Sequence, residues 1–157
     1  MKGPQVIGAT MAVLALGAMG LAPIGGAARA GTPASVAPRH GGKLTIVAPR
    51  KKSTLTGPKV TIEVKAEQFT LVAAGSPLKG GEGHLHFFID VPAKNVKVGA
   101  MIPLDTTSRY VHAGKEPYDR REIALAPGRH RITVVAANSA HLRLAEPKPV
   151  SVTFTVK

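Results

Sequence analysis

From Leu44 to the C-terminus, apolar and polar residues alternate along the chain with a period of two. Val60, Ile62 and Val64, for example, alternate with a threonine and a glutamate. This alternation is typical of strands that bury one face. Runs of the pattern, separated by turn residues, predict seven short strands at 44–48, 60–65, 69–72, 84–91, 122–125, 130–136 and 150–156.

The seven strands predict an all-β domain over residues 44–157, an immunoglobulin-like antiparallel β-sandwich. Their spacing is that of such sandwiches, and thirteen prolines limit long helices. Pro127 and Gly128 predict a tight hairpin between the strands that flank them. The residues expected to face the core are Leu85, Phe87, Ile89, Val91, Ile132, Val134, Val152 and Phe154.

The longest connection between predicted strands covers residues 92–121 and shows no clear period except around residues 100–104. A structureless segment of this length is unusual in a compact domain, so we expect a short edge strand within it. Its tip, residues 106–118, is where we expect mobility and function, because binding residues are concentrated on exposed loops.

The first 43 residues differ in kind from the rest. Lys2 is followed by an uncharged apolar run over residues 6–21 and by alanines at positions 28 and 30. This pattern predicts a signal peptide over residues 1–30, and an uncleaved anchor helix is the alternative. Residues 31–43 are rich in Pro, Ala and Gly and predict a flexible basic linker. We therefore expect an exported protein, periplasmic or secreted, whose mature form has no transmembrane segment.

The chain carries a net charge of +12, and residues 31–62 contain six basic residues and no acidic one. Two arginine pairs, at positions 120–121 and at 129 and 131, are expected on one exposed sheet face. Such a basic surface predicts attraction to an anionic component of the cell envelope, and a merely solvated surface is the alternative. Aromatic residues make up only 4% of the chain, which argues against stacking on single-stranded nucleic acid. We expect no specific nucleic-acid partner.

The predicted strand that begins at His84 carries the candidate chemistry. In an extended strand His84 and His86 lie on one face about 6.6 Å apart, a spacing that lets two imidazoles converge on one metal ion. A third ligand could come from His112 in the long connection or from His141 in the loop before the last strand. An all-imidazole site suits copper or zinc. The alternative is that His84 and His86 are partly exposed and serve only the structure.

Enzymatic activity is not expected. None of the six serines stands in a Gly-x-Ser-x-Gly context, and the glycine-rich segment 80–83 leads into a strand and lacks a P-loop lysine. The chain has no cysteine, which excludes disulfides, thiolate metal ligands and cysteine nucleophiles. His130 stands in register with the inward residues of its strand and is expected to be half-buried, with its ring nitrogens hydrogen-bonded.

The sequence Gly-Glu-Gly-His-Leu-His-Phe-Phe-Ile-Asp over residues 81–90 resembles the GxGHHHLLID strand of a bacterial family of small exported domains of unknown function. The resemblance extends from Leu44 to the C-terminus through the segments 102–105, 125–130 and 147–156. It implies an immunoglobulin-like sandwich without an established activity. Leu85 stands where the family has its middle histidine, which implies a site with fewer imidazoles.

Two functions remain open at this point, beside a metal-dependent enzyme built on the same histidines, for which no sequence feature supplies a general base. The first is an exported, non-enzymatic binding or accessory domain that holds copper or zinc weakly through His84, His86, His112 and His141. The second is an envelope interaction module that binds anionic surfaces or polymers through its basic face, with structural histidines. Three imidazole nitrogens close to one common point would favour the first. The sequence indicates no oligomeric state.

Overall fold

A computed structural model of the protein describes residues 41–104 and 109–157. The predicted signal peptide and most of the predicted linker lie outside the described residues. Among the residues described, no helix is long and apolar enough to cross a membrane. The elements of this part are β1 (Lys43–Ala48), β2 (Thr54–Leu55), β3 (Lys59–Glu67), β4 (Thr70–Leu71), β5 (Glu82–Ile89), the 3₁₀ turn η1 (Ala93–Asn95), β6 (Tyr110–His112), β7 (Arg120–Ala124), β8 (Gly128–Ala137) and β9 (Val150–Val156).

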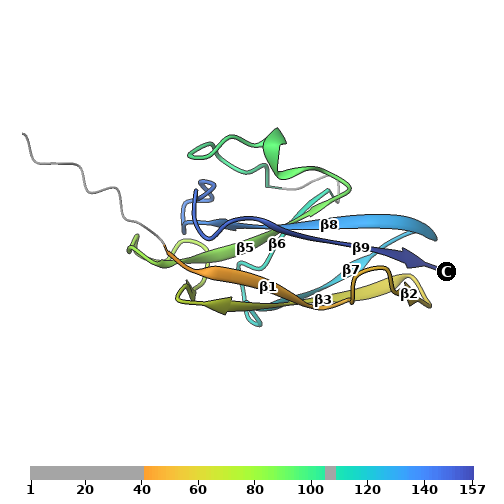
Figure 1. Cartoon of the computed structure of the whole chain (residues 1–157). Coiled ribbons are helices and arrows are strands. Elements are labelled where there is room, and N and C mark those ends of the chain that lie inside the picture. The colour runs from red at the N-terminus through yellow and green to blue at the C-terminus, as the bar shows by residue number, and fades with distance from the viewer. Residues whose placement is uncertain (1–40, 105–108) are drawn as a thin grey trace, which may run out of the picture. The chain divides into compact units, whose positions relative to one another are not determined.

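The strands form two sheets, which lie one above the other in Figure 1. One sheet has the order β1-β3-β7; the other has the order β2-β9-β8-β5-β4, with β6 paired to β5. Neighbouring strands are antiparallel except for the short pairings of β2 with β9 and of β4 with β5. Side chains from both sheets share one hydrophobic core. The chain therefore folds as an immunoglobulin-like β-sandwich, as the sequence predicts.

The core between the sheets follows the alternation of the sequence. Leu85, Phe87 and Ile89 of β5 pack there, and alternate residues of β8 and β9 do the same, so seven of the eight predicted inward residues are confirmed. Leu85 and Phe87 are completely buried. Removing such large apolar side chains from water is the main favourable contribution to the stability of the sandwich.

Asp90 ends the alternation of β5. Its φ of 56° lies in the left-handed region, and its carboxylate Oδ1 accepts a hydrogen bond of 2.7 Å from the backbone N–H of Arg131. The turn at Asp90 takes Val91 out of the central core and into a second hydrophobic cluster. The prediction that Val91 faces the central core is therefore wrong, because regular strand geometry stops one residue before it.

The outer face of the six-stranded sheet is covered by the connection that follows β5. Residues 92–104, which we call the strap, run over this face in Figure 1. Val96 and Ile102 of the strap share the second hydrophobic cluster with side chains of the sheet, namely Phe88, Val135 and Ala137. As a result every residue of β5 from Gly83 to Ile89 is buried, on both faces of the sheet.

Hydrogen bonds join the strap to the loop between β8 and β9. The backbone N–H of Ile102 donates to the carbonyl of His141 at 2.9 Å, and the N–H of Arg143 donates to the carbonyl of Ala100 at 2.9 Å. The guanidinium of Arg143 also donates to the carbonyl of Ala93 at 2.8 Å. The loop that carries His141 is thus held against the strap.

Two local predictions differ from the structure. Pro127 and Gly128 form no hairpin, because β7 and β8 belong to different sheets. For the same reason the arginine pairs of β7 and β8 do not share one sheet face. The short edge strand expected within residues 92–121 is present as β6, which pairs with β5, and the bridge from Met101 to Leu142 forms within residues 100–104. Part of the predicted mobile tip, residues 106–108, lies outside the described residues.

Candidate metal centre

Four histidines meet at the outer face of the six-stranded sheet. His84 and His86 project from β5, where they lie opposite Ala137 and Val135 of β8 in the strand register. His141 comes from the loop between β8 and β9, and His112 comes from β6, where it pairs with His86. All pairs of these rings have centroids between 4.7 and 5.9 Å apart. The fold therefore brings together all four histidines that the sequence singles out.

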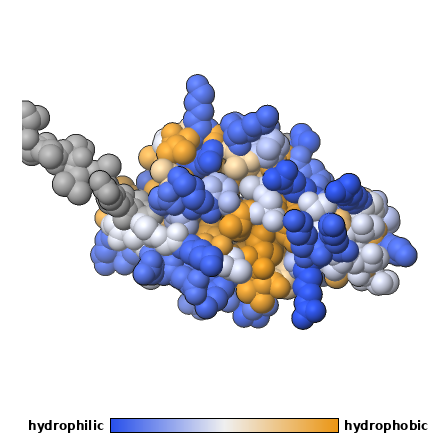
Figure 2. Space-filling view, in the orientation of Figure 1, coloured by the Kyte–Doolittle hydropathy of each residue, from blue (hydrophilic) through white to orange (hydrophobic). Residues whose placement is uncertain are grey.

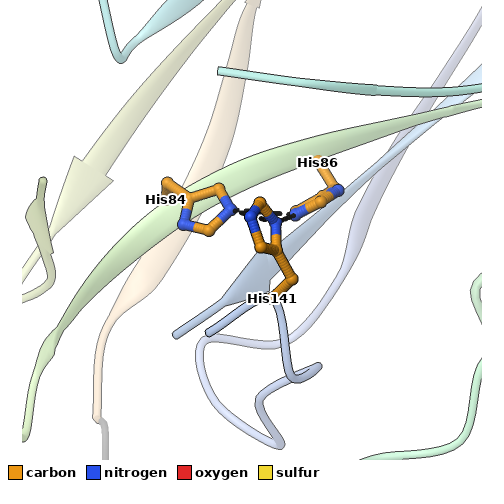
Figure 3. A group of neighbouring side chains, drawn as sticks. All are labelled: His84, His86 and His141. Carbon is orange, nitrogen blue, oxygen red and sulfur yellow. Dashed lines mark hydrogen bonds between the residues drawn. The ribbon is translucent and has the colours of Figure 1, made fainter. Parts of the chain in front are cut away.

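Three of these rings direct one nitrogen each toward a common point, as Figure 3 shows. His84 Nε2 lies 2.9 Å from His86 Nε2 and 3.1 Å from His141 Nδ1, and the last two atoms are 3.3 Å apart. Points with these separations lie on a circle of radius about 1.8 Å. An ion about 1 Å above their plane would lie roughly 2.0–2.1 Å from each nitrogen, the length of a zinc–imidazole bond.

Protons alone cannot satisfy these three nitrogens. A neutral imidazole has a hydrogen on one ring nitrogen and a lone pair on the other. Among three nitrogens that face one another, at least two are of the same kind, so at least one pair places two hydrogens or two lone pairs against each other. A cation that accepts all three lone pairs removes this conflict.

Burial keeps the imidazoles neutral. His84 and His86 are both 0% exposed. Burial, with smaller contributions from the neighbouring histidines, lowers the pKa of His84 to about 4 and that of His86 to about 2. Burial is also the main cause that lowers the pKa of His112 and the pKa of His141. At neutral pH the three nitrogens can therefore offer lone pairs to a metal ion.

In the two buried rings, the nitrogens that point away from the common point have no hydrogen-bond partner in the described part of the chain. His84 Nδ1 and His86 Nδ1 are buried and have no hydrogen-bond partner among the described residues. In tight metal sites the non-ligating N–H of a histidine usually donates to a carboxylate or carbonyl, and losing that partner weakens binding by about 10- to 100-fold. The arrangement of the ligands thus favours a weakly held ion.

His112 lies beside the three converging rings and does not join their nitrogens. Its ring stacks on that of His86, with centroids 5.5 Å apart and an interplanar angle of 25°. Its carbonyl accepts a hydrogen bond of 2.9 Å from Arg121 Nε. A Cβ at Gly114 would lie 2.6 Å and 2.8 Å from two atoms of the His112 ring, so the glycine leaves the space that the ring occupies. His112 therefore forms one wall of the candidate centre.

A tight turn fixes His141. Asn138 Oδ1 accepts hydrogen bonds of 3.0 Å from the backbone N–H groups of Ala140 and Leu142, and the N–H of His141 donates to the Asn138 carbonyl at 2.9 Å. His141 itself has a φ of 62°. Asn138 is absent from the residues that the sequence singles out, although an asparagine at the start of a short loop is a recognisable turn signal.

Gly83 has a comparable role next to His84. A Cβ at this position would lie 2.1 Å from the carbonyl oxygen of Ala137. The glycine therefore allows β5 to approach β8 closely where the first ligand emerges.

His130 lies elsewhere and is satisfied, as the sequence predicts. It lies seven positions along β8 from Ala137, the partner of His84, which corresponds to about 23 Å along a strand. Its Nδ1 lies 2.8 Å from Asp90 Oδ2 and its Nε2 lies 2.8 Å from the Ala126 carbonyl oxygen. Burial on its own lowers the pKa of His130, but the hydrogen bonds to Asp90 and Ala126 outweigh it and the pKa is raised.

Comparisons with known proteins agree with the implied family of unknown function. No curated protein matches this chain. Among solved structures, the fibronectin(III)-like modules of Clostridium thermocellum CbhA match with a TM-score of 0.41 and 18% sequence identity, covering 73% of this chain and 95% of that chain. The family model described as "Domain of unknown function (DUF4399)" matches residues 62–157. These residues include β5, β6, β8 and the loop of His141, so the chain belongs to the DUF4399 family and all four histidines lie within its family domain.

Proposed function

We propose that this protein is an exported, non-enzymatic domain that binds a transition metal, copper or zinc, through His84, His86 and His141. The observation that carries the proposal is the convergence of three neutral imidazole nitrogens within 2.9–3.3 Å of one another. Imidazole is a common ligand of both metals. His112, the fourth predicted ligand, is the wall of this site and lies outside the converging group.

The burial of the site supports binding more than catalysis. Two of the three ligands are completely buried, so an ion among them would have little surface to offer a substrate. A catalytic metal site instead keeps an open coordination position. The unpaired Nδ1 atoms of His84 and His86 support a weak, exchangeable ion.

Titration of the purified chain with Cu²⁺ and Zn²⁺ by calorimetry, and with Cu⁺ in the absence of oxygen, tests this function. We expect one ion per chain, and the single changes His84→Ala, His86→Ala and His141→Ala should each remove most of the affinity, because two imidazoles alone make a weak site. His130→Gln is the matched control, since this histidine lies at the far end of β8. Binding that survives the loss of both His84 and His86, or affinity no better than that of an unstructured histidine peptide, would contradict the proposal.

A second candidate function, attachment to an anionic lipid surface of the envelope, is favoured by the strap. Three of its apolar side chains are exposed: Val98 is 55% exposed, Met101 63% and Leu104 53%. The strap also carries the exposed Lys94 and Lys97 and contains no acidic residue. Exposed apolar side chains flanked by lysines are the combination that binds to anionic lipid interfaces.

Co-sedimentation with vesicles tests this second candidate. We expect binding to vesicles that contain phosphatidylglycerol, little binding to pure phosphatidylcholine, and weaker binding at high salt. The paired change Val98→Ser with Met101→Ser should reduce binding, whereas Leu78→Ser, which removes an apolar side chain that is 67% exposed outside the strap, should not. Equal losses in the two variants would contradict a specific role of the strap.

A further inference from the structure

We infer that the site formed by His84, His86 and His141 selects monovalent copper over divalent copper and zinc. The inference rests on the proposed metal-binding function and names the ion that the function concerns. Two features of the site carry it: the absence of negative charge among its ligands, and the number of nitrogens that converge.

The ligand set brings no negative charge. The group of ligand atoms that could hold an ion consists of three histidines, and no described aspartate or glutamate belongs to it. Neither buried ring passes its N–H to a carboxylate among the described residues, because both Nδ1 atoms lack partners. The charged side chain that contacts the wall of the site is Arg121, which donates to the carbonyl of His112 and adds positive charge.

Because the site is buried, the lack of negative charge among its ligands determines which ion binds best. His84 and His86 have no exposed surface, so an ion among their nitrogens loses most of its hydration. The cost of burying an ion rises with the square of its charge, so for ions of similar size a divalent cation costs about four times as much as a monovalent one. In buried sites of divalent metals, the negative charge of thiolate or carboxylate ligands usually compensates this cost. Three neutral imidazoles cannot supply this compensation, so the monovalent Cu⁺ loses less free energy on burial than Cu²⁺ or Zn²⁺ does.

The number of ligands points in the same direction. Three nitrogens converge, whereas the ring of His112 stacks on that of His86 at an interplanar angle of 25° and is not part of the converging group. Zn²⁺ in proteins is almost always four-coordinate, and Cu²⁺ prefers a tetragonal arrangement. Monovalent copper has a filled d shell and is stable with three ligands in a shallow pyramid or plane. The triangle of nitrogens in Figure 3 provides that arrangement without a water ligand.

Competition titrations on the full chain test the selectivity. Cu⁺ affinity is measured without oxygen, in ascorbate, against a colorimetric Cu⁺ chelator. Zn²⁺ and Cu²⁺ affinities are measured by competition in the same buffer without ascorbate. We expect Cu⁺ to bind about 100-fold or more tightly than Zn²⁺. X-ray absorption of the copper-loaded protein should show a filled-shell ion with three nitrogen neighbours.

One variant adds a negative charge to the ligand set and tests the selectivity for Cu⁺ separately from the ability to bind a metal. His141→Asp replaces the partly exposed ligand by a carboxylate and leaves both buried imidazoles in place. We expect it to lower the ratio of Cu⁺ to Zn²⁺ affinity by about tenfold or more, because the carboxylate compensates the divalent ion. The control change His130→Gln should leave the ratio unchanged.

The outcomes distinguish the inference from the proposed function. If Zn²⁺ or Cu²⁺ binds through the three histidines as tightly as Cu⁺, the selectivity is wrong and the metal-binding function stands. An unchanged affinity ratio in His141→Asp would also overturn the selectivity. If none of the three ions binds, the proposed function itself fails.

Discussion

The two faces of the six-stranded sheet are both buried, but they are built differently. On the inner face Leu85, Phe87 and Ile89 pack against the other sheet and form an apolar core. On the outer face His84 and His86 are equally buried, yet two of their nitrogens have no partner and two others face each other at 2.9 Å. Burying polar groups without partners costs free energy. The comparison therefore separates a face built for stability from a face whose unpaired nitrogens cost stability, a cost that the proposed metal binding would offset.

The inner face should respond most strongly to the loss of a side chain. Phe87 is completely buried, so Phe87→Ala should lower the free energy of unfolding by about 3–5 kcal/mol through lost transfer energy and the cavity left behind. Urea titration with a spectroscopic probe measures this loss. Lys51→Ala, at an exposed turn, is the control and should change the stability by less than about 0.5 kcal/mol. Equal and small losses in both variants would mean that the register of β5 is wrong.

The outer face should make the metal-free protein sensitive to acid. In the unfolded chain a histidine takes up a proton near pH 6.5, whereas the pKa is lowered to about 4 for His84 and to about 2 for His86 in the folded protein. The unfolded state therefore binds more protons below pH 6.5, and stability falls as the pH falls toward 4. Each histidine contributes about 1.4 kcal/mol per pH unit in this range.

Urea titrations between pH 7 and pH 4.5 with a chelator present test this dependence. The double change His84→Leu with His86→Leu should flatten it, because neither leucine can take up a proton. His130→Gln should not flatten it, since the raised pKa of His130 leaves that residue protonated in both states below pH 6.5. A steep loss of stability that persists in the double variant would assign the acid sensitivity to other groups.

A single apolar replacement on the outer face should stabilise the metal-free protein. His86→Leu keeps a side chain of similar size and removes both the unpaired Nδ1 and the close contacts of Nε2. We expect a gain of about 1–2 kcal/mol in the free energy of unfolding at pH 7, together with the loss of metal binding. A loss of stability as large as that of His86→Ala would instead assign His86 a structural role.

Much of the inner face, and less of the outer one, could be predicted from the sequence. Strand alternation places Phe87 inward and puts His84 and His86 together on the other face, because both follow from the period of two. The approach of His141 depends on the length and turn of a loop, and the burial of the outer face depends on where the strap folds back. Neither leaves a periodic signal. The same limit explains Pro127 and Gly128, whose local preference for a turn does not reveal that the flanking strands enter different sheets.

The smallest effect that we expect concerns the wall of the site. Gly114→Ala would bring a Cβ to within 2.6 Å of the His112 ring and 3.1 Å of the Ala74 Cβ, so the ring must move. His112 lies outside the three converging nitrogens, so the ion keeps its ligands and the affinity should fall only about two- to fivefold. Metal titration measures this change, and unfolding by urea should show little loss of stability because the ring lies at a partly exposed edge strand. If Gly114→Ala abolished binding as completely as His84→Ala, His112 would be a ligand of the ion, and the centre would have four imidazoles instead of three.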